Sequence, residues 1–165
     1  MQTKTDLESL IHDLQSSDRE RSRAAARHLA TMGPEAAPAA VALLELCGSD
    51  AEYDKWAIVA LEEMGSPRQA DADQLAGMLR NNCETVAYWA ATLLGRLGSA
   101  ADQTVSQLAQ AMESSGSMAV RERSAWALGR MGPAIHRVSA QLHRTASGQH
   151  KRLARLAATA IESTK

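Results

Sequence analysis

Four glycines recur at nearly constant intervals along the chain, and this periodicity constrains the fold more than any other feature. Gly33, Gly65, Gly98 and Gly132 close the segments ARHLATMG, IVALEEMG, ATLLGRLG and AWALGRMG, at spacings of 32, 33 and 34 residues. A fifth segment, AATAIESTK, follows after a further 33 residues, with Lys165 in place of the glycine. Self-similarity at a fixed period of this length is typical of stacked supersecondary units.

Apolar residues keep the same register in each copy. Segments such as VRERSAWALGRM place apolar or small residues at helical spacing, and a glycine just past the end is typical of a helix C-terminus. Pro34 and Pro133 directly follow their glycines and suit the first turn of a next helix. The sequence therefore predicts two helices per repeat. Leucine or isoleucine recurs four residues before each marker and leucine ten after it: Leu29, Leu61, Leu94, Leu128 and Ile161, then Leu43, Leu75, Leu108 and Leu142.

Helix starts carry a second signal, a hydroxyl residue followed three positions later by glutamate. Thr5-x-x-Glu8, Ser17-x-x-Glu20 and Ser49-x-x-Glu52 fit this capping box, in which the hydroxyl and the carboxylate satisfy free amides at a helix start. No segment shows the two-residue alternation of a strand over any length. We therefore expect one all-α domain, 1–165, built of five helical hairpins at 5–33, 34–65, 66–98, 99–132 and 133–165.

The residues inside the repeat indicate its family. Ankyrin and tetratricopeptide arrays share a period near 33 residues, but their T-P-L-H element and their Trp, Gly, Tyr and Phe order are absent. VRERSAWALGRMG, at 120–132, resembles the short HEAT-like repeat of the phycobilisome-lyase type, although copies two and five are degenerate. The resemblance implies a right-handed α-solenoid in which the second helix of each hairpin lines a concave face.

Composition and motifs argue against several other classes of protein. Apolar residues make up 45% of the chain and charged residues 22%, as in ordinary globular proteins. No signal peptide and no apolar run of roughly 18 residues is present, which predicts a cytoplasmic chain without a membrane partner. Cys47 and Cys83 lack zinc-ligand spacing, His28 takes a core-facing phase, and no His-Glu dipeptide or nucleophile motif occurs. We expect no enzyme activity, cofactor or metal.

The few aromatic residues all fall in predicted second helices. Trp56 and Trp89 lie nine residues before their markers, Trp126 six and Tyr88 ten, at positions that the HEAT-like motif leaves free. Tyr53 takes a core position instead. Because neighbouring helices pack about 8–10 Å apart, the three tryptophans are expected to form one row across repeats two to four. They would then line a binding groove or, alternatively, fill the space between repeats.

Basic residues outnumber acidic ones at the free positions of the second helices, although the whole chain has a net charge of −1. Arginine interleaved with tryptophan is typical of interface hot spots, because arginine stacks on rings and forms forked hydrogen bonds. Solvated charges or pairing along each helix would explain the same pattern without a partner. The predicted partner-binding residues are Trp56, Trp89, Trp126, Tyr88, Arg27, Lys55, Arg96, Arg123 and Arg130.

These features predict a non-catalytic scaffold or adaptor that binds an acidic, partly apolar segment of another protein. The alternative is an anionic ligand or single-stranded nucleic acid, since HEAT-like folds related to DNA-alkylation repair glycosylases use a basic concave face. A sequence pI near 6.5 and the lack of an inward aspartate argue against that alternative. The apolar segment LARLAATAIE in the last helix further predicts end-to-end self-association or docking onto something longer.

Overall fold

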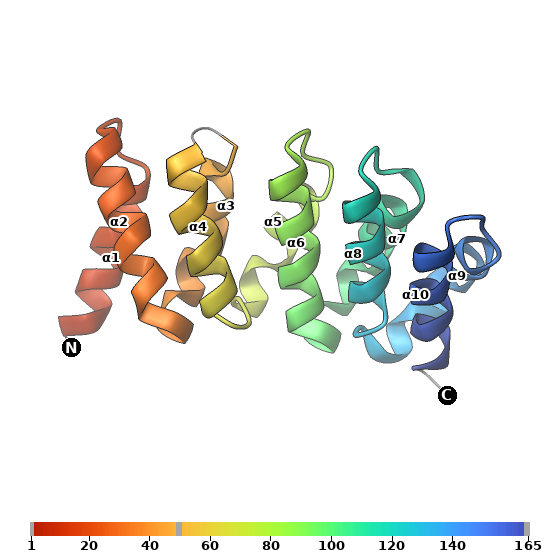
Figure 1. Cartoon of the computed structure of the whole chain (residues 1–165). Helices are drawn as coiled ribbons and strands as arrows, with labels where there is room; N and C mark the ends of the chain where they lie inside the picture. Colours follow the sequence, from red (N-terminus) through yellow and green to blue (C-terminus); the bar gives the residue numbers. More distant parts are fainter. Residues whose placement is uncertain (1, 49–50, 164–165) are drawn as a thin grey trace. The chain divides into compact units, whose positions relative to one another are not determined.

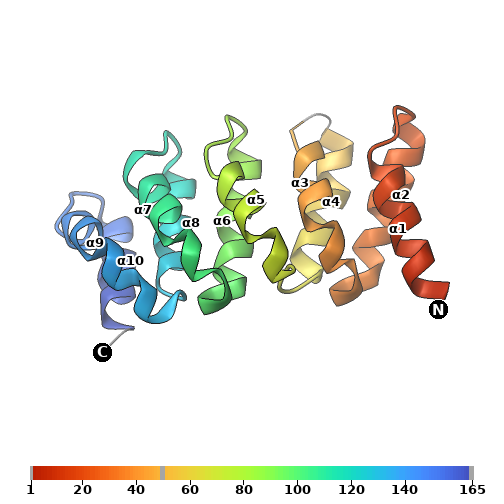
Figure 2. The ribbon, with the colours of Figure 1, turned by 180° about the vertical axis from the view of Figure 1, so that it is seen from behind.

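The computed structural model describes residues 2–48 and 51–163, and its regular elements in these ranges are all helical. The chain forms two compact units, Met1–Pro67 and Arg68–Lys165. Each unit is a stack of helical hairpins (Figures 1 and 2). The predicted all-α repeat architecture is therefore confirmed, whereas the expectation of a single domain stays a prediction.

The first unit contains two hairpins. Helices α2 and α4 pack side by side, and α1 packs against α2 and α3. Leu14, Leu29, Leu43 and Leu61 have no exposed surface and form the centre of its core. The elements are α1 (Gln2–Leu14), α2 (Arg19–Met32), the 3₁₀ helix η1 (Gly33–Ala39), α3 (Ala40–Leu46) and α4 (Ala51–Glu63).

The second unit contains three hairpins. Helix α8 packs between α6 and α10, and α7 packs between α5 and α9, so the even-numbered and odd-numbered helices form two layers (Figures 1 and 2). The elements are η2 (Gln69–Asp71), α5 (Ala72–Met78), α6 (Glu84–Leu97), η3 (Gly98–Thr104), α7 (Val105–Ser114), α8 (Met118–Leu128), η4 (Gly132–Val138), α9 (Ser139–Ala146) and α10 (Lys151–Glu162).

The periodic glycines break the backbone direction after each second helix, as their positions predict. Gly33 and Gly98 follow α2 and α6 directly, each with φ of +58°, a value that side chains with a Cβ rarely adopt. Gly65 and Gly132 also have positive φ, but α4 and α8 end earlier, at Glu63 and Leu128. Glycine permits the sharp exit that lets the next hairpin stack on the previous one.

Helix starts agree less well with the sequence. Helix α1 begins at Gln2, so Thr5 lies inside it and is not its cap. The cap of α2 is Asp18 rather than Ser17, because the Asp18 carboxylate accepts hydrogen bonds from the amides of Glu20 and Arg21. The third predicted cap, Ser49, lies outside the described residues. The prolines expected in first turns lie in 3₁₀ helices that precede α3 and α9.

The predicted core is largely confirmed. The leucines four residues before and ten residues after the glycine markers have no exposed surface, and Tyr53 is buried as expected. Ile161 is half-buried, and His28 is exposed, so its assignment to the core was wrong. Among the described helices, none combines the length and the apolar composition needed to cross a bilayer.

Candidate partner-binding face

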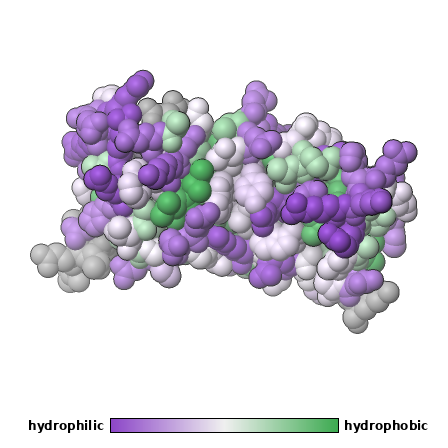
Figure 3. All heavy atoms as spheres, viewed as in Figure 1, coloured by the Kyte–Doolittle hydropathy of each residue, from purple (hydrophilic) through white to green (hydrophobic). Residues whose placement is uncertain are grey.

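The predicted site residues lie on the even-numbered helices of the two units, except Arg130, which lies in the turn that follows α8. We call the outer sides of these helices, with Arg27, Lys55 and Trp56 in the first unit and Tyr88, Arg96, Arg123, Trp126 and Arg130 in the second, the even-helix faces. Figure 3 views the even-numbered helices from the same side as Figure 1 and shows hydrophilic side chains interspersed with near-neutral ones. Hydrophobic residues form only small patches there.

In the first unit, two cations flank one indole. Trp56 on α4 is half-buried, and Arg27 on α2 places its guanidinium carbon 5.4 Å from the ring centroid. The Lys55 ammonium lies 5.3 Å from the same centroid. Both distances are within the range of cation–π attraction, which is about 6 Å. The aromatic ring therefore holds two positive charges at the surface.

A shallow depression of about 190 Å³ lies beside this indole. Arg23 lies among its lining residues and forms ion pairs with Glu20 and Glu52, at 3.0 and 3.4 Å. The two glutamates exceed the charge of Arg23 by one, so these three residues together with Arg27 and Lys55 carry one net positive charge.

In the second unit, Arg123 on α8 lies between two aromatic rings. Its guanidinium carbon is 4.6 Å from the centroid of Tyr88 on α6 and 4.9 Å from that of Trp126 on its own helix. One guanidinium nitrogen also donates a hydrogen bond to the Tyr88 hydroxyl. The two cation–π contacts and the hydrogen bond together restrict the orientation of this cation. A planar guanidinium held in this way loses little further freedom when it binds an anion.

Trp126 in turn lies against a glycine of the neighbouring helix. A Cβ atom built on Gly95 would lie 2.9 Å from Cε3 of the Trp126 ring, which real Cβ atoms do not tolerate. Arg130 completes the arrangement, since its Nε donates to the carbonyl oxygen of Gly95 at 2.8 Å and its Cζ lies 5.3 Å from the Trp126 centroid. The absent side chain at Gly95 thus makes room for the indole between α6 and α8.

Trp89 is buried, which fits the alternative expectation that a tryptophan fills space in the fold better than the expectation that it lines a groove. Only 8% of the residue is exposed. The Tyr88 ring meets it edge to face at a centroid distance of 6.1 Å, and the Arg96 guanidinium carbon lies 5.6 Å from its centroid. Trp89 therefore packs beneath Tyr88 and Arg96 in the interior of the unit, and little of its own side chain is exposed to contact a partner.

A depression of about 320 Å³ opens on the even-helix face of the second unit. Arg152 on α10 pairs with Glu122 on α8 at 3.1 Å at this depression. It is lined by Tyr88, Ala119, Glu122, Arg123, Trp126, Arg152 and Leu156. Three of the predicted site residues are thus brought together, and Glu122, Arg152 and Leu156 join them. Arg152 and Glu122 carry the charge pattern noted in the sequence, but the sequence does not show that they meet.

The structure brings the aromatic and the basic residues of these faces into contact. Each half-buried ring of the even-helix faces has a cation of this chain within cation–π distance, so the rings act as platforms for cations. Trp56 lies in one unit and Trp89 and Trp126 in the other, so the single row of three indoles stays a prediction.

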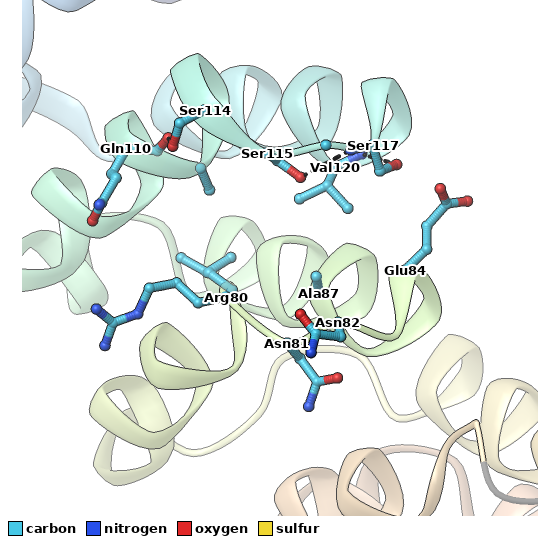
Figure 4. Close-up of a pocket in the computed structure, with 13 residues that line it drawn as sticks. Arg80, Asn81, Asn82, Glu84, Ala87, Gln110, Ser114, Ser115, Ser117 and Val120 are labelled. Carbon is cyan, nitrogen blue, oxygen red and sulfur yellow. Dashed lines mark hydrogen bonds between the residues drawn. The ribbon is translucent and has the colours of Figure 1, made fainter.

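A larger pocket, of about 510 Å³, lies away from these residues, between the loops that precede α6 and α8 (Figure 4). Leu79, Ala87, Ala111 and Val120 give it apolar surface, and polar side chains including Arg80, Asn82, Glu84 and Gln110 surround it. The polar residues of this pocket have the composition of ordinary turns, so no pattern in the sequence marks it.

No group of three or more histidine, cysteine, aspartate or glutamate side chains with metal-site geometry occurs among the described residues.

A profile of the HEAT repeats family matches residues 72–162, more than half of the chain. The chain belongs to the HEAT repeat family. The match is to HEAT repeats in general, so the phycobilisome-lyase subtype remains a prediction. No curated protein shows significant sequence similarity to this HEAT repeat chain.

Several solved repeat proteins are similar in structure. A designed armadillo repeat protein in complex with the peptide (KR)4 has a TM-score of 0.66 and 17% identity, covering 96% of this chain and 81% of that one. A second structure, of computationally designed armadillo repeat proteins for modular peptide recognition, has a TM-score of 0.65 and 15% identity. The match covers 98% of this chain and 83% of that one. An engineered protein has a TM-score of 0.62 and 23% identity, and the match covers 96% of this chain and 78% of that one. At these identities the likeness establishes the helical repeat fold alone.

Proposed function

We propose that this HEAT repeat chain is a non-catalytic interaction module that binds a segment of a partner protein on its even-helix faces. Helical repeat arrays mainly present extended binding surfaces. The fold supports the proposal further, since one similar designed armadillo protein holds a peptide and others were designed for peptide recognition.

The observation that carries the proposal is the support of surface cations by aromatic rings. Arg123 lies between Tyr88 and Trp126, and Arg27 lies over Trp56. Arginine and tryptophan together are enriched among the residues that dominate protein interfaces. The binding residues we assign are Arg27, Lys55, Trp56, Tyr88, Arg96, Arg123, Trp126 and Arg130, with Trp89 supporting them from below.

The positive charge of these faces favours an acidic partner segment. Guanidinium groups form paired hydrogen bonds with carboxylates, and these charge-assisted bonds are about twice as strong as neutral ones. The similar designed protein in complex with (KR)4 binds a basic peptide. We infer the opposite preference for this chain.

The same geometry disfavours single-stranded nucleic acid. Nucleotide bases would have to stack on exposed rings, yet Arg123 already lies over Tyr88 and Trp126. Base stacking would therefore have to displace the chain's own guanidinium groups. Capture that is abolished by nuclease would indicate nucleic acid instead.

The test is affinity capture from native lysate, with and without nuclease, using three chains checked for folding by circular dichroism. The face variant is Arg27→Gln/Arg123→Gln, and the matched control is Arg137→Gln/Arg144→Gln, which removes the same charge from exposed arginines of η4 and α9. We expect the wild type to capture a partner protein also after nuclease treatment. The face variant should lose this partner, and the control variant should still capture it. Capture abolished by nuclease, or equal capture by all three chains, would overturn the proposal.

The cytoplasmic location and the end-to-end self-association remain predictions.

A further inference from the structure

The depression of about 320 Å³ on the second unit has a defined charge pattern. Arg123 and Arg152 each contribute a positive charge and Glu122 a negative one, so its lining carries one net positive charge. Glu122 is the less exposed member of its ion pair, with 18% of its side chain accessible against 72% for Arg152. Arg152 thus neutralises Glu122, and Arg123 is left to determine what the depression attracts.

Apolar surface adjoins this charge. The Trp126 ring, Leu156 and Ala119 line the same depression. Leu156 and Trp126 are both half-buried, so each retains exposed surface for contact. An occupant that combines one anionic group with an adjacent apolar side chain would match both parts of the lining.

We infer that this depression receives one aspartate or glutamate side chain of the partner segment, with an apolar side chain of the partner against Trp126 and Leu156. The inference rests on the proposed function and specifies the chemistry of one position in the partner. Arg123, held between Tyr88 and Trp126, forms the fork that binds the carboxylate. Glu122 lowers the affinity for anions, and its pairing with Arg152 limits this effect.

The charge balance favours a carboxylate over a phosphate. A single carboxylate neutralises the one net positive charge of the lining. A phosphate group carries roughly −1.5 to −2 near neutral pH, which leaves an excess negative charge next to Glu122. Like charges held close together in a partly desolvated site reduce affinity and so contribute to specificity.

The probes are fluorescein-labelled, C-terminally amidated peptides with three copies of Gly-Glu-Leu, three copies of Gly-Gln-Leu, and three copies of Gly-phosphoserine-Leu. Fluorescence anisotropy at low salt gives a dissociation constant for each. We expect the wild type to bind the glutamate peptide at least about tenfold more tightly than the glutamine peptide, the difference made by a charge-assisted hydrogen-bonded pair. Stronger binding of the phosphoserine peptide would overturn the carboxylate assignment.

Variants of the depression separate charge from geometry. Arg123→Gln should bind the glutamate peptide about tenfold more weakly than the wild type. Arg123→Lys keeps the charge but not the two parallel N–H donors of the guanidinium, so its affinity should lie between those of the wild type and Arg123→Gln. Glu122→Gln should bind this peptide several-fold more tightly. Arg137→Gln, a matched loss of charge on η4, should bind like the wild type.

Unchanged affinity in Arg123→Gln, or no difference between the glutamate and glutamine peptides, would overturn this inference. The same holds if the wild type fails to bind the glutamate peptide. None of these results decides the proposed function, which is judged by the capture of a native partner and its loss with Arg27→Gln/Arg123→Gln.

Discussion

Gly95 on α6 lies directly against the indole of Trp126 on α8, with no space for a Cβ between them. The pair sets how closely two neighbouring second helices approach on the face we assign to partner binding. Gly129, one repeat later, lies at the equivalent position opposite Ala160 of α10, where a Cβ would be 3.4 Å from the nearest backbone atom. The same glycine of the repeat therefore leaves no room for a Cβ in one copy, whereas the next copy has room for one.

Substituting each of these glycines by alanine tests this difference. In Gly95→Ala the new methyl group must displace the Trp126 ring, and overpacking of this kind lowers the free energy of unfolding by about 1–3 kcal/mol. Gly129→Ala should be neutral within about 1 kcal/mol, because alanine favours helical backbone over glycine. Urea unfolding followed by circular dichroism measures both. Equal stability of the two variants would contradict the close contact.

The positive φ at the repeat glycines predicts a second pair of effects. Gly98→Ala places a Cβ in a backbone conformation of φ +58° and 3.0 Å from the Arg130 carbonyl oxygen. It should therefore lower the free energy of unfolding by more than about 1 kcal/mol. Gly77→Ala in α5 meets no atom within 4 Å and should raise it by about 0.5–1 kcal/mol. Thermal unfolding of both variants provides the measurement, and a tolerated Gly98→Ala would count against the assigned backbone.

Ser124 carries a hydroxyl that the fold does not use. The residue is fully buried, and its Oγ has no hydrogen-bond partner among the described residues. Ser124→Ala should raise the free energy of unfolding by about 1 kcal/mol, since an unpaired buried hydroxyl costs desolvation energy. In contrast, Ser22→Ala should lower it by about 1 kcal/mol, because Ser22 donates to the Leu14 carbonyl at 2.9 Å. Chemical unfolding compares the two, and a loss of stability in Ser124→Ala would show that its hydroxyl is paired.

Tyr53 should make stability depend on alkaline pH. Burial raises the pKa of its hydroxyl above the ordinary value of 10.0. Above pH 10 the unfolded chain loses this proton while the folded chain retains it, so folding stability falls as pH rises and is fully present below pH 10. The slope from this group approaches about 1.4 kcal/mol per pH unit. Urea unfolding between about pH 8 and 11 should show a smaller slope for Tyr53→Phe, and identical slopes would contradict the shift.

The repeat and its core could be predicted from the sequence because they depend on local chemistry. Leucine at fixed spacing identifies the buried side of each helix, and glycine marks where the backbone must take positive φ. The caps were less predictable, because neighbouring polar residues compete for the same amides. Asp18 displaces Ser17 in this role, since its carboxylate is well placed to accept from two backbone N–H groups.

The site could be predicted as a set of residues but not as an arrangement. Trp56 and Trp89 occupy the same position of the repeat, yet Trp56 is half-buried and Trp89 is buried. The residue before Trp89 is Tyr88, which contacts it edge to face, whereas the residue before Trp56 is Lys55. The repeat periodicity assigns both tryptophans to the same position and therefore does not predict their different burial. Likewise, the position of Arg123 between two rings depends on a contact across helices that no local pattern encodes.

The most direct test of the central claim is hydroxyl-radical footprinting of the chain alone and in complex with its captured partner. We predict that oxidation of Tyr88, Trp126 and Leu156 falls on binding, while oxidation of His136 and His143, which are exposed on η4 and α9, stays unchanged. Protection of the two histidines, with Tyr88 and Trp126 oxidised as in the free chain, would place the partner elsewhere and contradict the account.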